Sequence, residues 1–285
     1  MNASKIFIVG ANGQLGTALK AQYTEAQFAD IDELDITDKK SVDAFDWSGV
    51  EIILNAAAYT NVDGAETLEG RVAAWKVNAE AVKNLSYVVW QHKLKAIVHI
   101  STDYVFDGTA KEHDENEAFA PLSVYGASKA AGDLLVSQVD KHYILRTSWV
   151  IGEGNNFVRT MMGLGAKGVA PTVVHDQVGR LTFTSELVRA IDHLLTTEAP
   201  FGTYNVSNSG EPASWADVTR QIFKDAGYGL LVTNTTTQEY YEGKDSVAPR
   251  PLSSTLKLDK IQATGFKSVD WKEDLRKYIE KEQAS

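Results

Sequence analysis

Short apolar runs alternate with longer helical patterns along the first half of this chain. Strand-like runs occupy residues 5–9, 27–31, 51–58, 95–102 and 143–149. Residues 66–93 carry apolar side chains at helical spacing. This alternation predicts a parallel sheet with helices on both faces. Small or polar residues follow each run, and the carboxyl ends of the strands are where open α/β sheets bind ligands.

The pattern becomes less regular beyond residue 150. Thr184 or Ser185 is the expected N-cap of one further helix, and Ser214 is a good N-cap for another. Helical spacing recurs in residues 156–162, 184–195 and 271–281, and a strand pattern in residues 172–176.

Composition narrows the class of protein. The formal net charge of −10 argues against a general binder of nucleic acid or anionic membranes, which needs clustered basic surface. Cysteine is absent, which excludes disulfides and thiolate metal sites and fits a reducing compartment. No apolar stretch is long enough to span a bilayer, and no signal segment precedes the first strand. We expect a cytoplasmic protein.

A glycine-rich turn follows the first strand directly. Gly10, Gly13 and Gly16 form a GxxGxxG pattern, and the residues after Gly13 continue as a plausible amphipathic helix. In a strand, turn and helix of this kind, backbone N–H groups at the helix N-terminus bind the pyrophosphate of a dinucleotide. The pattern alone is a moderate signal, and its position after the first strand strengthens it.

The fold prediction follows from the alternation and the glycine turn together. We predict an α/β chain with a Rossmann-type doubly wound parallel sheet. Residues 1–150 would form the dinucleotide-binding domain. Residues 151–285 would form a smaller, mainly substrate-binding lobe, some segments of which return to the sheet, because no Pro/Ser-rich linker separates the two halves.

Tyr125 and Lys129 stand four residues apart, a spacing that places two side chains on one face of a helix. A lysine ammonium close to a phenol stabilises the phenolate and lowers the phenol pKa. Such a tyrosine can exchange a proton with a substrate oxygen while a bound dinucleotide exchanges a hydride with the attached carbon. Thr102, at the end of the fourth strand, is placed to hydrogen-bond the same oxygen. The predicted chemistry is reversible carbonyl reduction.

Three further positions belong to the expected ligand edge. Asp30 ends the second strand, where a dinucleotide fold places an acid against ribose hydroxyls, although a turn aspartate is an equally good interpretation. No Arg or Lys adjoins Asp30 in sequence to pair with a 2′-phosphate. Ala57 and Ala58 leave room for a flat cofactor, and Trp149 follows the fifth strand. The histidines show no HxH or HExxH spacing, so no metal site is predicted.

These motifs together resemble the dTDP-4-dehydrorhamnose reductases, a family within the extended short-chain dehydrogenases/reductases. The strings Ser-Thr-Asp-Tyr-Val-Phe and Arg-Thr-Ser-Trp-Val are the most specific. The resemblance runs nearly end to end, through residues 10–16, 34–38, 55–63, 101–106, 125–129, 146–150, 154–157 and 250–251.

The resemblance implies roles for particular residues. Thr102, Tyr125 and Lys129 would be catalytic. The substrate would contact Thr102, Asp103, Tyr104 and Trp149, with Asn156 and Arg250 as candidates for the nucleotide diphosphate. NADPH or NADH would be bound by Gly10, Asn12, Gly13, Gln14, Leu15, Gly16, Asp30, Ile31, Asp35, Ile36, Ala57, Ala58, Tyr59, Thr60, Ile100, Tyr125 and Lys129.

The reaction implied by the resemblance is reduction of the C4 keto group of dTDP-4-dehydro-L-rhamnose to dTDP-L-rhamnose. Two alternatives stay open: a reductase or epimerase of another nucleotide sugar, and a non-catalytic regulatory subunit like the β-subunit of methionine adenosyltransferase. The chain would be a monomer or a homodimer. Some family members form a magnesium-linked dimer, but the sequence does not support placing such Mg²⁺ ligands here. Leu181 stands where the family usually has proline, which relaxes the loop 176–182.

Overall fold

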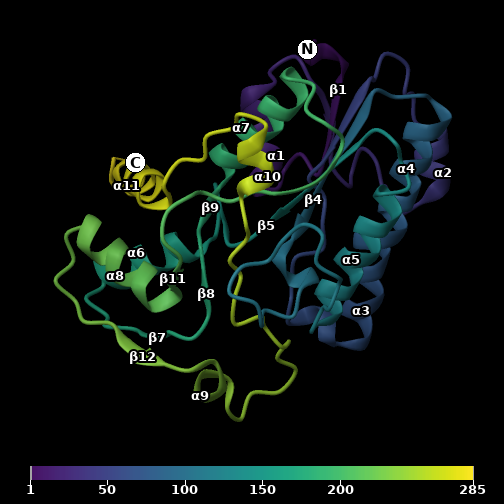
Figure 1. Cartoon of the computed structure of the whole chain (residues 1–285). Coiled ribbons are helices and arrows are strands. Elements are labelled where there is room, and N and C mark those ends of the chain that lie inside the picture. The colour runs from purple at the N-terminus through teal and green to yellow at the C-terminus, as the bar shows by residue number, and fades with distance from the viewer. Residues whose placement is uncertain (1, 285) are drawn as a thin grey trace.

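The structure, a computed structural model, describes residues 2–284 (Figure 1). Its central layer is a sheet of six parallel strands in the order β10-β5-β4-β3-β1-β2. The sheet strands are β1 (Ile6–Val9), β2 (Gln27–Ala29), β3 (Ile52–Asn55), β4 (Ala96–Thr102), β5 (His142–Thr147) and β10 (Gly202–Asn205). The predicted fold class is confirmed. Strand β10 comes from the second half of the chain and pairs with β5.

The strand order reverses beside β1. From β1 the chain passes outward to β2 and then returns to place β3 on the other side of β1. At such a switch point the loops after the two neighbouring strands diverge to opposite faces of the sheet and leave a crevice. The glycine turn therefore opens beside the small residues that follow β3.

Helices cover both faces because the strand side chains alternate. Ile6 and Ile8 of β1 pack into one hydrophobic core, whereas Phe7 and Val9 pack into another. The helices are divided between the two cores. The first core takes side chains from α1 (Gln14–Gln22), α7 (Thr184–Thr196) and α10 (Asp259–Ala263), and the second from α2 (Lys39–Ala44), α4 (Ala81–Gln91) and α5 (Val124–Val136).

The predicted helix over 66–93 is interrupted. It consists of α3 (Leu68–Trp75), a π-helical turn (Lys76–Glu80) and α4. The side chain of Asn78, in the π turn, accepts from the Tyr59 N–H at 2.9 Å and donates to the Tyr59 carbonyl at 3.1 Å. Single π turns inside α-helices are frequent at functional sites. Here the turn holds the segment that follows β3.

Most of the remaining elements surround a separate core and lie on the left side of Figure 1. Leu181, in the loop 176–182 that was expected to be relaxed, is fully buried in this core, so packing holds the loop. The helices here are α6 (Phe157–Ala166), α8 (Trp215–Asp225), α9 (Thr237–Tyr241) and α11 (Trp271–Gln283). Three short strand pairs join them: β6 (Val150–Ile151) with β9 (Thr182–Phe183), β7 (Thr172–Val174) with β12 (Thr233–Thr235), and β8 (Val178–Gly179) with β11 (Ala213–Ser214).

The helix starts differ in how well the sequence predicted them. Ser214 caps α8 in a reciprocal pair with Asp217, as expected. The predicted cap of α7 is wrong: Thr184 is already the first helical residue, and the N-cap is Phe183, which makes no side-chain capping bond. Its backbone N–H instead donates to the Asn208 side chain at 2.9 Å, a partner distant in sequence. Within residues 2–284, every helix is too short or too polar to cross a bilayer.

Candidate active site

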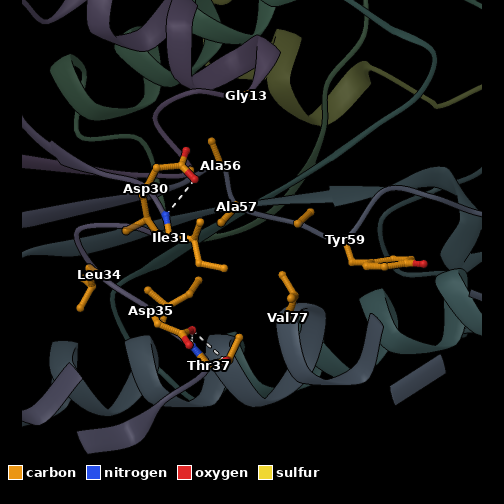
Figure 2. A pocket seen from close by; sticks show the side chains of 14 residues that line it. Gly13, Asp30, Ile31, Leu34, Asp35, Thr37, Ala56, Ala57, Tyr59 and Val77 are labelled. Atoms are coloured by element: carbon orange, nitrogen blue, oxygen red, sulfur yellow. Dashed lines mark hydrogen bonds between the residues drawn. The ribbon is translucent and has the colours of Figure 1, made fainter. Parts of the chain in front are cut away.

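A cleft of about 330 Å³ lies at the switch point of the sheet (Figure 2). Nine of the residues predicted to bind the cofactor line it: Gly10, Gly13, Asp30, Ile31, Asp35, Ile36, Ala57, Ala58 and Tyr59. Five lining residues were not predicted: Val9, Leu34, Thr37, Ala56 and Val77. Val77 reaches the cleft from the π turn, and its sequence pattern gave no sign of that position.

The glycine turn is built for close approach. Gly10 has φ +75°, and a Cβ there would lie 2.6 Å from the Cα of Ala57. A Cβ on Gly16 would lie 2.1 Å from the Gly10 carbonyl oxygen. Gly13 is the N-cap of α1 and offers no side chain to the N–H groups of the first turn. Those N–H groups and the positive end of the helix dipole therefore suit a pyrophosphate.

Asp30 ties the second strand to the glycine turn. One carboxylate oxygen accepts from the Asn12 N–H and the other from the Ile31 N–H, both at 2.8 Å. Lys20, on α1, reaches the side chain of Asn12 at 3.2 Å. A cation therefore lies close to the Asp30 corner of the cleft, although none adjoins Asp30 in sequence. Asp35 accepts from Thr37, and that hydrogen bond lowers the pKa of the Asp35 carboxyl.

The other predicted cofactor residues lie around the cleft and do not line it. Asn12, Gln14, Leu15 and Gly16 belong to the turn and the first turn of α1, and Leu15 packs into the core beneath. Thr60 is exposed beyond Tyr59. Ile100 lies on β4, and its carbonyl oxygen accepts a hydrogen bond from Lys129 at 2.6 Å.

Thr102 and Tyr125 are brought together from two elements. Thr102 is the last residue of β4, and Tyr125 lies in the first turn of α5, which Ser123 caps. Both side chains are buried, and Thr102 opposes the rise in the pKa of the Tyr125 phenol that burial causes. Tyr59, which lines the cofactor cleft, packs against the hydrophobic cluster that contains Tyr125. Tyr104 packs edge-on against the Tyr125 ring at a centroid distance of 5.5 Å.

Lys129 lies one helical turn beyond Tyr125 and is fully buried. Burial lowers its pKa to about 8, although the nearby Asp133 carboxylate favours the charged form. His99, on β4, lies 3.4 Å from the Lys129 amine. The Asn55 side-chain oxygen accepts from the Ala57 N–H, so its amide nitrogen faces His99 Nδ1 and the imidazole proton lies on Nε2. Burial lowers the pKa of His99 well below its usual range.

One electrostatic expectation is wrong for the protein without bound ligands. The Tyr125–Lys129 spacing predicted a lowered phenol pKa, but burial raises the pKa of Tyr125 above its usual value. The neighbouring Thr102 opposes this rise without overcoming it. The free-energy cost of removing the phenolate from water is larger than the stabilisation that its neighbours provide. Tyr125 therefore holds its proton and is suited to act as an acid.

A second cavity of about 260 Å³ opens on the other side of Tyr104 and is rich in aromatic side chains. Trp149 has φ +48°, a conformation that is rare outside glycine, and its ring stacks on Trp215 at 3.6 Å and 17°. A Cβ on Gly179 would lie 3.1 Å from the Trp149 ring. The lining includes Tyr104, Trp149, Phe157, Gln177, Trp215, Tyr240, Tyr241, Arg250 and Ser254.

The remaining predicted substrate residues have different surroundings. Arg250 lines the aromatic cavity and forms an ion pair with Asp63 at 2.8 Å, which lowers the pKa of the Asp63 carboxyl. Asn156 is the N-cap of α6, and its amide nitrogen donates to Tyr278 and to the Gly152 carbonyl. Asp103 is buried behind Thr102 and does not line the cavity.

The fold and the site define a class of protein. A glycine turn at the switch point of a parallel sheet, followed by a threonine, tyrosine and lysine set at the end of β4 and on α5, characterises a dinucleotide-dependent oxidoreductase of the short-chain dehydrogenase/reductase type. A family model described as the RmlD substrate binding domain matches residues 4–284. The chain belongs to this family, whose members include dTDP-4-dehydrorhamnose reductases.

Similar proteins cover nearly the whole chain. A dTDP-4-dehydrorhamnose reductase of Aggregatibacter actinomycetemcomitans is 39% identical over 96% of this chain and 97% of its own. A crystal structure of the Bacillus anthracis dTDP-4-dehydrorhamnose reductase in complex with NADP is 35% identical, with a TM-score of 0.87 over 97% of this chain and 98% of its own. A probable dTDP-4,6-dihydroxy-2-methyloxan-3-one 4-ketoreductase of Streptomyces antibioticus is 36% identical over 94% of this chain and 92% of its own.

Proposed function

We propose that this chain reduces the C4 keto group of dTDP-4-dehydro-L-rhamnose to give dTDP-L-rhamnose, with NADPH or NADH as hydride donor. The observation that carries the proposal is the position of Tyr125. It is buried in one hydrophobic cluster against which Tyr59 of the cofactor cleft and Tyr104 of the aromatic cavity both pack, and Thr102 acts on the pKa of its phenol. A carbonyl held between the two cavities would be within reach of this phenol.

The cleft fits a nicotinamide dinucleotide, because Gly10 and Gly13 line it where α1 begins and the N–H groups of the first helical turn have no side-chain cap. The bound cofactor supplies hydride to the carbonyl carbon. Thr102 orients the carbonyl oxygen by a hydrogen bond, and Tyr125 gives that oxygen its proton. The product is an alcohol, and the phenol is left as phenolate. Lys129, whose pKa of about 8 leaves it mostly protonated at neutral pH, stabilises that phenolate.

The aromatic cavity suits a nucleotide sugar. The stacked Trp149 and Trp215 offer flat apolar surfaces to a base or to a sugar face. Arg250 supplies a cation for the diphosphate, once that anion displaces or joins Asp63. The printed names of relatives at similar identity support a dTDP-linked keto sugar as the substrate. Asn156 already uses its amide groups within the protein, so we leave it out of the proposed contacts.

A second candidate substrate is favoured by one observation. The Streptomyces antibioticus relative carries the name of a 4-ketoreductase for a different dTDP sugar, at an identity close to that of the rhamnose enzymes. Tyr125 and Thr102 would serve both reactions equally, because both reduce a ketone. The alternative of a non-catalytic subunit is disfavoured because Thr102, Tyr125 and Lys129 are all in place.

Turnover with a defined substrate tests the proposal. The purified chain is mixed with dTDP-4-dehydro-L-rhamnose, and the absorbance of NADPH and of NADH is followed in separate assays. We expect cofactor oxidation with formation of dTDP-L-rhamnose, and a loss of at least about a hundredfold in kcat for Tyr125→Phe with unchanged cofactor binding. A parental protein that is inactive on this sugar but reduces another dTDP 4-keto sugar would support the second candidate. An unchanged rate in Tyr125→Phe would remove Tyr125 from its role.

We further infer a cytoplasmic protein that acts as a monomer or homodimer, with a division into two lobes near residue 150. The cysteine-free composition supports the reducing compartment. The separate hydrophobic core of α6, α8 and α11 supports the second lobe. Light scattering after size-exclusion chromatography, with and without MgCl₂, measures the oligomeric state. A mass that changes with the ion would indicate a magnesium-dependent assembly.

A further inference from the structure

Arg250 lies in a closed ring of contacts with a loop from the other half of the chain. Its Nη2 donates to Asp63 Oδ2 and its Nη1 donates to the Ala248 carbonyl, both at 2.8 Å. The Ala248 N–H donates to the other Asp63 oxygen at 3.0 Å. Pro249 and Pro251 restrict the backbone on either side of Arg250. One carboxylate therefore holds both the guanidinium and the backbone beside it.

Asp63 does not serve the helix that it begins. It is the N-cap of a short 3-10 turn (Gly64–Glu66), yet its side chain makes no capping bond there. An aspartate at an N-cap usually accepts from the N–H groups of its own helix. Here both carboxylate oxygens accept from residues 248–250 instead. The side chain is therefore committed to the segment that carries Arg250.

The same turn contacts the catalytic helix. Oε1 of Glu66, the last residue of the turn, accepts from the Val124 N–H at 2.9 Å. Val124 begins α5, and Tyr125 follows it directly. Asp63 and Glu66 stand three residues apart, a spacing at which side chains eclipse in a 3-10 turn. The turn therefore joins the Arg250 segment to the helix that holds the reacting phenol, through direct hydrogen bonds at both ends.

Arg250 keeps donors for a ligand. Its side chain is 14% exposed and lines the aromatic cavity, where its Cζ lies 4.7 Å from the centre of the Tyr241 ring. A guanidinium has five N–H donors, and Asp63 and Ala248 each take one from Arg250. The other three have no partner within residues 2–284. Phosphate oxygens are acceptors that match the geometry of a guanidinium well.

We propose that Asp63 is a positioning residue for the sugar nucleotide: it holds the Arg250 guanidinium at one place in the aromatic cavity, where the remaining N–H groups bind the diphosphate, and it stays bound to Arg250 in the complex. This inference rests on the proposed function and deepens it. Because the turn after Asp63 contacts α5, the bound diphosphate takes a fixed place relative to Tyr125. The carbonyl of the attached sugar then meets the phenol in a productive geometry.

The benefit of Asp63 comes from a fixed guanidinium, because its own negative charge repels a phosphate. A free arginine side chain loses rotamer freedom when it binds a ligand, which weakens binding by roughly two- to tenfold. With Asp63 in place, most of this freedom is lost before the ligand arrives. The Asp63 side chain is 48% exposed, so solvent screens its repulsion of a nearby phosphate.

Binding of dTDP, measured by titration calorimetry without the keto sugar, tests this role. In Asp63→Ala we expect the Kd of dTDP to rise about two- to tenfold, with an unchanged Kd of NADPH. Arg250→Ala should raise the Kd of dTDP at least as much. In the double variant, loss of Asp63 should add nothing to loss of Arg250, because Asp63 acts only through Arg250. Asp245→Ala is the matched control: it removes an exposed acid from the segment before Arg250 and should change neither constant.

Turnover separates positioning from simple affinity. With saturating dTDP-4-dehydro-L-rhamnose and NADPH, kcat of Asp63→Ala should fall by about threefold or more, since a mobile guanidinium no longer fixes the carbonyl beside Tyr125. KM should rise as well, and an unchanged kcat would overturn the link to Tyr125. Asp63→Asn keeps an oxygen for Arg250 without the ion pair and should show smaller changes in the same direction. It carries the test if Asp63→Ala does not fold.

Three results would overturn the positioning role. An unchanged or lower Kd of dTDP in Asp63→Ala would show that Asp63 plays no part or competes with the diphosphate. The same rise in Kd on an Arg250→Ala background would indicate a structural role. A parental protein that does not bind dTDP would remove the ligand itself. By contrast, a parent that binds dTDP with this dependence on Asp63, but does not reduce the keto sugar, would disprove only the proposed reaction.

Discussion

Replacement of Asp30 tests how the cleft selects between NADH and NADPH. The Asp30 carboxylate accepts the Asn12 and Ile31 N–H groups and lines the cleft. Asp30→Asn removes the charge and leaves one oxygen for these two donors. A ribose with free hydroxyls loses a charged acceptor in this variant, whereas a ribose 2′-phosphate loses a repulsive neighbour.

The magnitude follows from simple electrostatics. A doubly charged phosphate about 5 Å from a carboxylate in a water-like dielectric is disfavoured by roughly 1.7 kcal/mol, about fifteenfold in affinity. A hydrogen bond from a ribose hydroxyl to a charged acceptor is worth about 1.5–3 kcal/mol. We therefore expect the Kd of NADH to rise about tenfold in Asp30→Asn. The Kd of NADPH should change by less than about threefold, because the lost turn contact and the relieved repulsion oppose each other.

Titration calorimetry or quenching of tryptophan fluorescence measures both constants in the absence of substrate. Glu33→Gln is the matched control, since Glu33 is a neighbouring acid that accepts the Asp30 N–H at 2.9 Å without lining the cleft. It should leave the ratio of the two constants unchanged. Equal losses for NADH and NADPH in Asp30→Asn would refute the reasoning and reduce Asp30 to a residue that shapes the turn.

Three other substitutions test the site. Gly16→Ala should lower stability by about 1–3 kcal/mol and weaken cofactor binding, because the new Cβ would meet the Gly10 carbonyl. Gly163→Ala is the control and should not lower the Tm, because the space around Gly163 is open. Equal Tm values for the two variants would contradict the clash. Lys129→Met should abolish turnover yet raise stability at pH 7. In the folded protein the pKa of Lys129 is about 8, below the unfolded value of 10.5. The free energy of unfolding of the parent should therefore increase as the pH rises from 8 to 10.5, and that of the variant should not. Unfolding measured at about pH 7 and about pH 10 tests this difference. Trp215→Leu should raise KM for the sugar nucleotide about two- to tenfold without changing cofactor Kd, and a parental KM would exclude the stacked pair from binding.

The sequence predicted the local features of the site, because these features depend on interactions between residues only a few positions apart. The run before Gly10 and the helix after Gly13 depend on side-chain alternation and glycine geometry within a few residues. The spacing of Tyr125 and Lys129 required only a helix, which α5 supplies. The sequence therefore indicated the parallel sheet, its ligand edge and the class of chemistry.

Contacts between distant segments depend on packing, and the sequence alone carried no signal for them. Trp149 meets Trp215, and Arg250 meets Asp63, only because the chain folds back across many residues. Lys20 comes close to Asp30 through Asn12, and this contact also depends on the tertiary fold.

Burial decided the electrostatics of the site. The sequence alone predicted that a phenol, an amine and a glycine turn belong to one edge of a parallel sheet, because the strand and helix patterns and the Tyr125–Lys129 spacing are local. Only the tertiary structure decided that burial raises the pKa of Tyr125, that the pKa of Lys129 falls to about 8, and that His99 lies beside the Lys129 amine. The reason is that loss of water around a charge depends on everything packed about it, not on its neighbours in the chain.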